Sequence, residues 1–198
     1  SRTSAWSRTV CLPRREVKYF TSDTHFRHGN ILAFEPWRQS WARNISAMDE
    51  KLIEAWNAKV LPHDTIYHLG DFCFGNENQI HDIAKRLNGE IYLILGNHDR
   101  TAASNARCGL RAVKSIQVTS DTGLRFICKH DPRKFTVQEA EENDFLLHGH
   151  LHGQLHHDGI DPRITAKLLD VGVDAVRSIY PLTIEEVSEL CMRKSPIS

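Results

Sequence analysis

The stretch Leu93-Ile94-Leu95-Gly96-Asn97-His98-Asp99-Arg100 decides the fold prediction for this chain of 198 residues. The apolar run that ends at Leu95 predicts a buried strand. Gly96 allows the chain to turn tightly, and an amide, an imidazole, a carboxylate and a guanidinium then follow in succession. A buried strand that ends in a group of polar side chains is typical of a functional site at the carboxyl edge of an α/β sheet.

Four other predicted strands end in polar side chains in the same way. Strands and helices alternate in the first half and hairpin signals follow in the second, which predicts a mixed sheet with helices on both faces. The predicted strands are 17–21, 65–69, 90–95, 113–118, 124–129, 145–147 and 168–173. The predicted helices run from a cap at Asn44 or Ser46 to Pro62, then over 77–87, 137–142 and 183–193. The polar residues at the strand ends are Asp23, His25, Asp71, Asn97, His98, His130, His150 and His152.

Composition and charge describe a globular protein without a strong electrostatic preference. Apolar residues make up 40% and charged residues 25% of the chain, with 25 basic and 25 acidic side chains. This zero formal charge argues against strong non-specific nucleic-acid binding, and no apolar run approaches the roughly 18 residues of a membrane span. The five cysteines form no CxxC pair, which favours a reducing cytoplasm. We expect one domain over residues 16–198, preceded by a tail at residues 1–15 that need not be ordered.

The polar residues at the strand ends offer nitrogen and oxygen donors but no sulfur. Such ligands suit manganese, iron, nickel, cobalt or zinc better than calcium or a thiolate-bound zinc. This set offers more donors than one ion needs, and a single carboxylate such as Asp71, with donors before and after it in the chain, is well suited to bridge two ions. Paired ions can clamp a phosphate and activate a water. The pattern therefore predicts a two-metal site.

These residues also form five ordered blocks: Asp23-Thr24-His25, Gly70-Asp71, Gly96-Asn97-His98-Asp99, His130 and Gly149-His150-Leu151-His152. Over roughly residues 17–186 the blocks resemble the signature of the calcineurin-like metallophosphoesterase superfamily. The finer sequence at 26–31, 68–72 and 170–174 is similar to a branch of small bacterial and phage phosphoesterases. The resemblance implies an α/β fold in which a four-layer β-sandwich of mixed sheets is flanked by helices, with a di-metal site at the carboxyl ends of the strands.

The resemblance also implies a reaction and a role for each residue of the blocks. The reaction is hydrolysis of a phosphate ester by in-line attack of a metal-bridging hydroxide, with manganese favoured among the candidate ions. His98 would contact the scissile phosphate and assist the leaving group instead of binding metal. Asp23, His25 and His152 would hold the first ion, Asn97, His130 and His150 the second, and Asp71 would bridge the two.

One departure from the family narrows the substrate class. The protein-phosphatase branch carries an Asp and an Arg after its Gly-Asp block, where this chain has Phe74 and Gly75. This argues against a phosphoprotein phosphatase and leaves the orienting partner of His98 unassigned. We expect Arg100 to contact phosphate on physical grounds, because a guanidinium forms paired hydrogen bonds with phosphate oxygens. His28 and Asn30 follow the first block and are candidates to line the substrate entrance, beside Asn97.

The sequence suggests several functions, which differ in the features that they require. The segment between Asp99 and His130 is too short for a large capping domain, so an open site and a phosphodiester substrate, nucleotide-like or small, are favoured over a phosphomonoester. A catalytically silent binding module on the same scaffold would lack ligands or the histidine at position 98. A His-Asp domain hydrolase is suggested by five His-Asp pairs, but that fold is helical and the key pairs here follow predicted strands. The phosphodiesterase is the preferred hypothesis.

Overall fold

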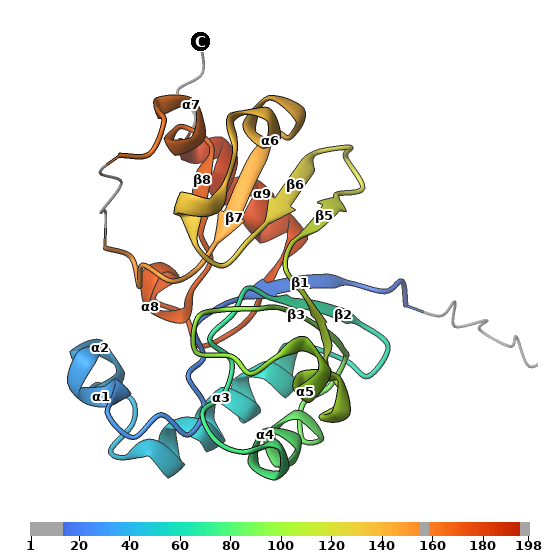
Figure 1. The fold of residues 1–198 in the computed structure, drawn as a ribbon. Coiled ribbons are helices and arrows are strands. Elements are labelled where there is room, and N and C mark those ends of the chain that lie inside the picture. Colours follow the sequence, from blue (N-terminus) through green and yellow to red (C-terminus); the bar gives the residue numbers. More distant parts are fainter. Residues whose placement is uncertain (1–13, 155–158, 195–198) are drawn as a thin grey trace, which may run out of the picture.

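Two mixed β-sheets stack face to face between outer layers of helices in the computed structural model (Figure 1). The structure describes residues 14–154 and 159–194. Most of the tail predicted at residues 1–15 lies outside these ranges. Its last two residues are described and contact the body of the protein, because Arg14 donates to the Asp64 carboxylate at 3.0 Å and Arg15 to Asp121 at 2.7 Å.

The first sheet has five strands in the order β4-β3-β2-β1-β9. Strands β1 to β4 are parallel to their neighbours and β9 is antiparallel to β1. Parallel neighbours end at the same edge of the sheet, so the residues that follow them lie close together. The strands are β1 (Lys18–Thr21), β2 (Thr65–His68), β3 (Glu90–Ile94), β4 (Arg111–Val113) and β9 (Leu182–Thr183).

The second sheet has four strands in the order β5-β6-β7-β8, of which only the β5–β6 pair is antiparallel. The prediction of one strand over residues 113–118 is wrong in detail. A strand of the first sheet ends at Val113, and a strand of the second sheet begins at Ile116. The chain therefore crosses from one sheet to the other between these two residues. The strands are β5 (Ile116–Thr119), β6 (Arg125–Cys128), β7 (Phe145–His148) and β8 (Leu168–Asp170).

Alternating side chains on each strand divide the core into layers. Along β1, Tyr19 packs with the helices outside the first sheet, whereas Phe20 packs between the two sheets. Along β7, Leu147 lies between the sheets and Leu146 belongs to the core on the outer face of the second sheet. Successive side chains of a strand point to opposite faces, so strands this apolar need cover on both sides. The expected four-layer arrangement is confirmed.

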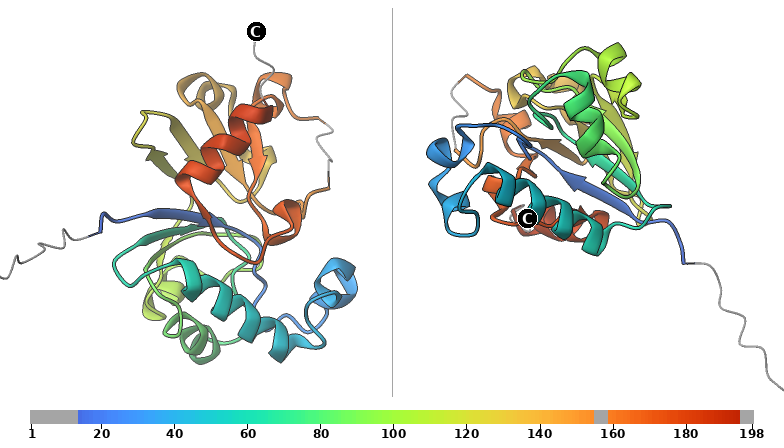
Figure 2. Two further views of the ribbon diagram at one scale, coloured as in Figure 1. Left: turned by 180° about the vertical axis from the view of Figure 1, so that it is seen from behind. Right: turned by 90° about the horizontal axis from the view of Figure 1, so that it is seen from below.

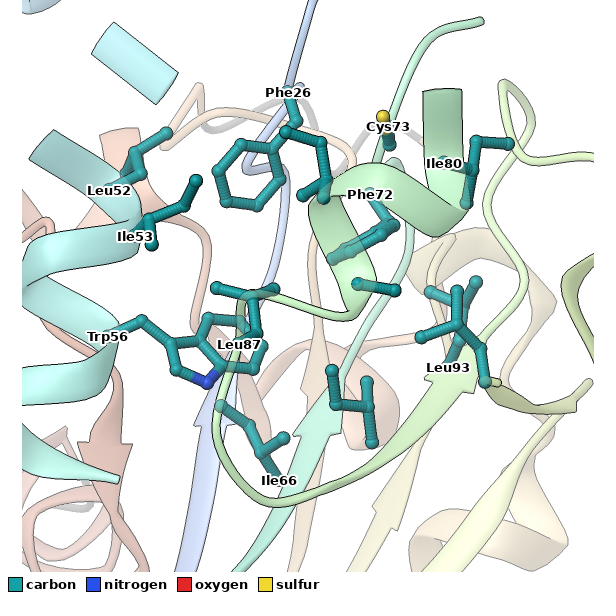
Figure 3. Close-up of a cluster of buried hydrophobic side chains, with 14 of the residues drawn as sticks. Phe26, Leu52, Ile53, Trp56, Ile66, Phe72, Cys73, Ile80, Leu87 and Leu93 are labelled. Carbon is teal, nitrogen blue, oxygen red and sulfur yellow. The ribbon is translucent and has the colours of Figure 1, made fainter. Parts of the chain in front are cut away.

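The outer face of the first sheet is covered mainly by α3 (Ile45–Lys59) and α4 (Glu77–Ala84), with α5 (Ala102–Arg107) beside β4 (Figure 1). The Asn44 side chain caps α3 by accepting from the Ala47 N–H at 2.8 Å. Figure 3 shows how apolar side chains from these helices, including Trp56 and Ile80, meet those of the strands. Helix α3 lies within the stretch predicted from a cap at Asn44 or Ser46 to Pro62. Helix α4 begins at the predicted residue 77 but ends at Ala84, three residues before the predicted end at 87.

The second sheet is covered on its outer face by α6 (Val137–Glu142) and α7 (Pro162–Thr165), while a short 3-10 helix, η1 (Pro132–Lys134), follows β6. On its other face, α9 (Ile184–Lys194) packs against the core between the sheets and crosses the second sheet in the view from behind (Figure 2). The predicted capping box is present: the Glu186 N–H donates to Thr183 Oγ1 and the Thr183 N–H to the Glu186 carboxylate.

Three further short helices lie near the carboxyl ends of the strands. These are α1 (Ile31–Phe34), α2 (Pro36–Gln39) and α8 (Val173–Val176), each of four residues. Figure 1 shows α1 and α2 projecting on the side of the molecule where α8 lies between the two layers. Within the described ranges, no helix combines the length and the hydropathy that a membrane crossing requires.

Candidate metal centre

The loops that follow β1, β2, β3, β6 and β7 carry the candidate ligands to the edge where the two sheets meet. The sheets are stacked, so residues far apart in the sequence become neighbours there. For example, the His150 N–H donates to both carboxylate oxygens of Asp23, at 3.2 and 3.0 Å. The seven predicted ligands fall into two groups that share one carboxylate.

The first group contains Asp23, His25 and His152, whose candidate donor atoms lie within 4.8 Å of one another. The Nε2 atoms of the two histidines are 3.3 Å apart, and Asp23 Oδ1 lies 3.9 Å from that of His25 and 3.8 Å from that of His152. Asp23 is fully buried and His25 is 3% exposed. Three candidate donors, those proposed for the first ion, therefore lie close together.

The second group contains Asp71, His130 and His150, again with candidate donor atoms within 4.8 Å. His130 Nε2 lies 3.0 Å from Asn97 Oδ1 and 3.5 Å from Asp71 Oδ2. His130 Nδ1 lies 2.7 Å from the Leu69 carbonyl oxygen, which can only accept a hydrogen bond, so Nε2 is the nitrogen that faces the group. His150 Nε2 also lies 2.9 Å from the Arg133 guanidinium.

Asp71 lies between the two groups. Its Oδ2 is 3.8 Å from His25 Nε2 on one side and 3.5 Å from His130 Nε2 on the other. Its Oδ1 accepts a hydrogen bond from the His98 N–H at 3.0 Å, which fixes the orientation of the carboxylate. This is the position that a bridging ligand requires.

Burial and mutual charge shift the pKa values of the candidate ligands in opposite directions. Burial raises the pKa of Asp23 to about 7 and lowers that of His25 to about 2. Burial would also raise the pKa of Asp71, but the hydrogen bond and charge of His130 outweigh it and the pKa falls below its usual range. Against the effect of burial, Asp71 raises the pKa of His130 to about 9. Metal ligands must be deprotonated, so an ion that binds this cluster would have to displace these protons, and its affinity would depend on pH.

Five of the seven candidate ligands have left-handed backbone torsions, which residues other than glycine adopt rarely. Each such residue costs of order 1–3 kcal/mol, and strain of this kind concentrates at functional sites. The sequence gives no signal for this feature. The residues and their φ values are Asp23 at 56°, His25 at 51°, Asp71 at 53°, His150 at 71° and His152 at 48°.

Two glycines allow the ligand loops to approach one another. A Cβ atom at Gly96 would lie 2.2 Å from Asp71 Oδ1, and one at Gly149 would lie 2.4 Å from Asp23 Oδ2. Neither contact is possible without displacing a candidate ligand. The Asp99 carboxylate joins the same two loops, because it accepts hydrogen bonds from the N–H groups of Asp71 at 2.8 Å and Gly96 at 2.8 Å. Asp99 thus supports the loops.

His98 lies at the exposed rim of the site. Its ring centroid is 6.0 Å from that of His25 and 5.1 Å from that of Phe74. Phe74, which occupies one of the positions where the protein-phosphatase branch differs, also stacks on the His28 ring at 4.0 Å. An aromatic ring therefore stands beside His98 and connects it with His28. Of the substrate-side predictions, His28 lies against this rim through Phe74.

The other substrate-side predictions are Arg100, Asn30 and Asn97. The Arg100 guanidinium donates to Ser104 Oγ and to the Gly75 carbonyl, each at 3.2 Å. Asn30 is exposed, and its carbonyl oxygen accepts hydrogen bonds from the N–H groups of the last two residues of α1, Ala33 at 2.9 Å and Phe34 at 3.2 Å. None of these hydrogen bonds joins Arg100 or Asn30 to a candidate ligand. The side chain of Asn97 does contact one, because its Oδ1 lies 3.0 Å from His130 Nε2.

Sequence reasoning missed two buried charges behind the first group. Arg38 on α2 is fully buried and forms a two-point ion pair with Asp174 on α8, at 2.9 and 2.8 Å. Asp174 Oδ2 in turn lies 2.7 Å from His152 Nδ1. In the sequence, the segment 170–174 is distinguished only by its similarity to a family branch, and nothing in the pattern around Arg38 indicates a role for that residue.

Comparisons with known proteins agree with the fold. A sequence model described as "Calcineurin-like phosphoesterase superfamily domain" matches residues 19–167. An uncharacterized protein of Methanocaldococcus jannaschii is 28% identical over 179 residues, covering 87% of this chain and 89% of that protein. The Gene 66 protein of Mycobacterium phage L5 is 34% identical over 185 residues, covering 79% and 86% respectively. The crystal structure of a protein of unknown function from Aquifex aeolicus aligns with a TM-score of 0.69 and 27% identity, covering 89% of this chain and 100% of that one.

Proposed function

The chain belongs to the calcineurin-like phosphoesterase superfamily, and from this premise we propose that it is a di-metal hydrolase of phosphate esters that prefers diesters. The observation that carries the proposal is the position of Asp71. One carboxylate oxygen faces His25 Nε2 on one side and His130 Nε2 on the other, so two groups of donors share it. A single-ion site would not need this arrangement.

The donor set fits two divalent cations. All seven candidate ligands offer oxygen or nitrogen, and the four described cysteines, which are buried in the cores, are not among them. The first ion would be held by Asp23, His25 and His152, the second by Asn97, His130 and His150, with Asp71 shared. Manganese is the favoured ion, since carboxylate and amide oxygens contribute along with imidazoles. The same completeness argues against a silent binding module, which would lack some of these residues.

The chain's own residues supply the rest of the reaction. When bound, the ions would polarise the phosphate and activate the attacking water. His98 stands at the rim, outside both groups, where it can reach the leaving oxygen and stabilise its charge or give it a proton. The His98 N–H holds Asp71, so the segment that carries the leaving-group histidine also orients the shared carboxylate.

The exposure of the rim supports a diester. Asn97 and His98 are exposed, while Asp23, His25, Asp71 and His130 form a buried floor. The segment from 101 to 129 folds into α5, β4, β5 and β6, which join the helical layer and the two sheets. A substrate with substituents on both sides of the phosphorus fits an open rim of this kind. A phosphomonoesterase with the same chemistry is the alternative.

The first test combines metal analysis with two substrates. The purified chain is loaded with manganese, its metal content is measured, and it is assayed with bis-nitrophenyl phosphate and with nitrophenyl phosphate. We expect about two ions per chain and faster turnover of the diester, both lost after chelation and restored by manganese. Turnover of the monoester alone would favour the alternative. Absence of both metal and turnover would contradict the hydrolase and revive the binding module.

A further inference from the structure

We propose that Arg38 is a positioning residue that fixes two ligands of the first ion, Asp23 and His152, relative to each other. This inference rests on the proposed function, because it concerns the same metal centre. Arg38 lies on α2, 14 residues from Thr24 and 136 residues from Asp174, yet it contacts both. It therefore joins three separate segments of the chain behind the site.

Arg38 contacts the backbone of the loop that carries the first ligands. Its Nη1 donates to the Thr24 carbonyl at 2.9 Å and its Nη2 to the Asp23 carbonyl at 2.5 Å. Asp23 is one of the residues with left-handed torsions, at φ 56°. A strained backbone persists only where its surroundings hold it. The guanidinium helps to stabilise this backbone, because its planar group of N–H donors binds two carbonyl oxygens of the loop at once.

Arg38 reaches the other ligand through Asp174. The guanidinium and the Asp174 carboxylate pair at two points, and the second carboxylate oxygen lies 2.7 Å from His152 Nδ1. Because a carboxylate can only accept, Nδ1 carries the hydrogen and Nε2 is directed at Asp23 and His25. Glu35 Oε1 lies 3.4 Å from the same Nδ1. Carboxylates in this position fix the orientation of a ligating imidazole.

A stabilising role in folding alone does not explain the choice of residues. Placing a guanidinium that is fully buried beside a carboxylate costs desolvation energy, and a well-packed apolar pair is often at least as stable. The contacts of Arg38 end on the backbone of one candidate ligand and, through Asp174, on the side chain of another. The expected effect of losing Arg38 is therefore selective, weakening the first ion and leaving the second in place.

The experiment measures manganese binding to the full chain with Arg38→Met, Arg38→Lys and Asp174→Asn. A matched control is Arg86→Met, which removes a similar two-point pair with Glu50 at the surface. Bound manganese is counted after titration of the metal-free protein. Electron paramagnetic resonance then distinguishes a coupled pair of ions from a single ion, and thermal melting of the metal-free protein reports folding.

We expect two ions per chain in the wild type and in Arg86→Met. In Arg38→Met and Asp174→Asn, one ion should bind at least ten-fold more weakly, with the spectrum of a single ion at intermediate manganese concentrations. Arg38→Lys should weaken the binding of this ion less, since a lysine keeps the positive charge but lacks the planar guanidinium. If Arg38→Met does not fold, the nearly isosteric Asp174→Asn decides the question.

Two results would overturn the inference in different ways. Wild-type affinity for both ions in the folded variants would refute the positioning role and leave the proposed function intact. An equal loss of both ions, in step with a lower melting temperature of the metal-free protein, would mean that Arg38 acts only on folding. A wild-type chain that binds no manganese would refute the proposed function together with this inference.

Discussion

Asp71 and His98 are linked by one hydrogen bond, yet their proposed roles can be separated by substitution. Asp71→Asn replaces a charged oxygen shared by both groups, so we expect weaker binding of both ions and no detectable turnover of bis-nitrophenyl phosphate. His98→Ala keeps the backbone N–H that holds Asp71, so we expect two bound ions and a kcat lower by about 100-fold or more. Metal content and steady-state kinetics on the same preparations test both.

Full activity in either variant would contradict the assignment. Loss of metal from His98→Ala would be equally informative, because it would make this histidine a ligand instead of the leaving-group residue.

Gly96 tests how closely the ligand loops must approach. Its Cβ would meet Asp71 Oδ1 at 2.2 Å and the Asp71 backbone nitrogen at 2.5 Å, so Gly96→Ala must displace the shared carboxylate or its loop. We expect a free energy of unfolding lower by about 1–3 kcal/mol and fewer bound ions per chain. Urea denaturation and elemental analysis measure the two effects. Gly29→Ala is the control, since a Cβ there has nothing within 4 Å, and equal effects of both would refute the argument.

Much of the grouping of candidate residues was predictable, because each of them lies in a loop that follows an apolar strand. His130 and His150 are recognisable because each follows an apolar strand, although the sequence does not show how the two sheets pack to bring them together. Arg38 could not be predicted, because it lies in a helix of four residues, too short for a periodic pattern, and its partner is 136 residues away. The sequence also carries no signal for the left-handed torsions of the ligands.

Among the structural elements, β1 and β2 are joined at their amino ends by the buried carboxylate of Asp64. It accepts hydrogen bonds from the N–H groups of Val17 at 2.9 Å and Leu61 at 2.8 Å and from the Arg14 guanidinium at 3.0 Å. Burial would raise the pKa of Asp64, but these donors outweigh it and the pKa is lowered. The carboxylate form therefore stabilises the fold above the unfolded pKa of about 4, and this contribution is lost as the pH falls below it.

Asp64→Asn should lower the free energy of unfolding at pH 7 by about 1.5–3 kcal/mol, the usual effect of losing hydrogen bonds to a charged group. The difference from the wild type should shrink as the pH falls below about 4. Urea denaturation at a series of pH values measures both. Asp121→Asn, which removes an exposed ion pair with Arg15, should change stability by less than about 0.5 kcal/mol at any pH. A constant difference for Asp64→Asn across the pH series would be evidence against the charge argument.

The long helices α3 and α9 were predicted well, because their capping residues are visible in the sequence. The stretch 113–118 shows the limit. Val113 and Ile116 both look like parts of one β-rich run, but they belong to strands in different sheets. The alternation of side chains gives the face of a strand and not the sheet to which it belongs, so the crossing between layers was not predictable.

For the whole molecule, the core between the sheets decides whether the two halves fold together. The ring centroid of Phe20 on β1 lies 5.2 Å from that of Tyr67 on β2 and 6.4 Å from that of Phe126 on β6. Aromatic rings therefore join the first sheet to the second. The candidate ligands come from loops of both sheets. A single domain over residues 16–198, which we propose, would therefore unfold and lose its metal centre in one transition.

Phe126→Ala tests this proposal from the second sheet. Phe126 is fully buried, so its loss should lower the free energy of unfolding by about 3–5 kcal/mol. The three described tryptophans, Trp37, Trp41 and Trp56, pack with the core outside the first sheet and report on that side by fluorescence. Circular dichroism reports on the whole chain.

If the layers form one cooperative unit, urea midpoints from fluorescence and from circular dichroism should coincide in the wild type and shift together in Phe126→Ala. The matched control is Phe34→Ala, which truncates a residue that is 64% exposed. It should change the free energy of unfolding by less than about 0.5 kcal/mol and leave both midpoints close to those of the wild type. A fluorescence transition that stays in place while the circular dichroism transition moves would show that the first sheet and its helices unfold independently. In that case the two sheets would be separate folding units, and the metal centre would form only when they dock.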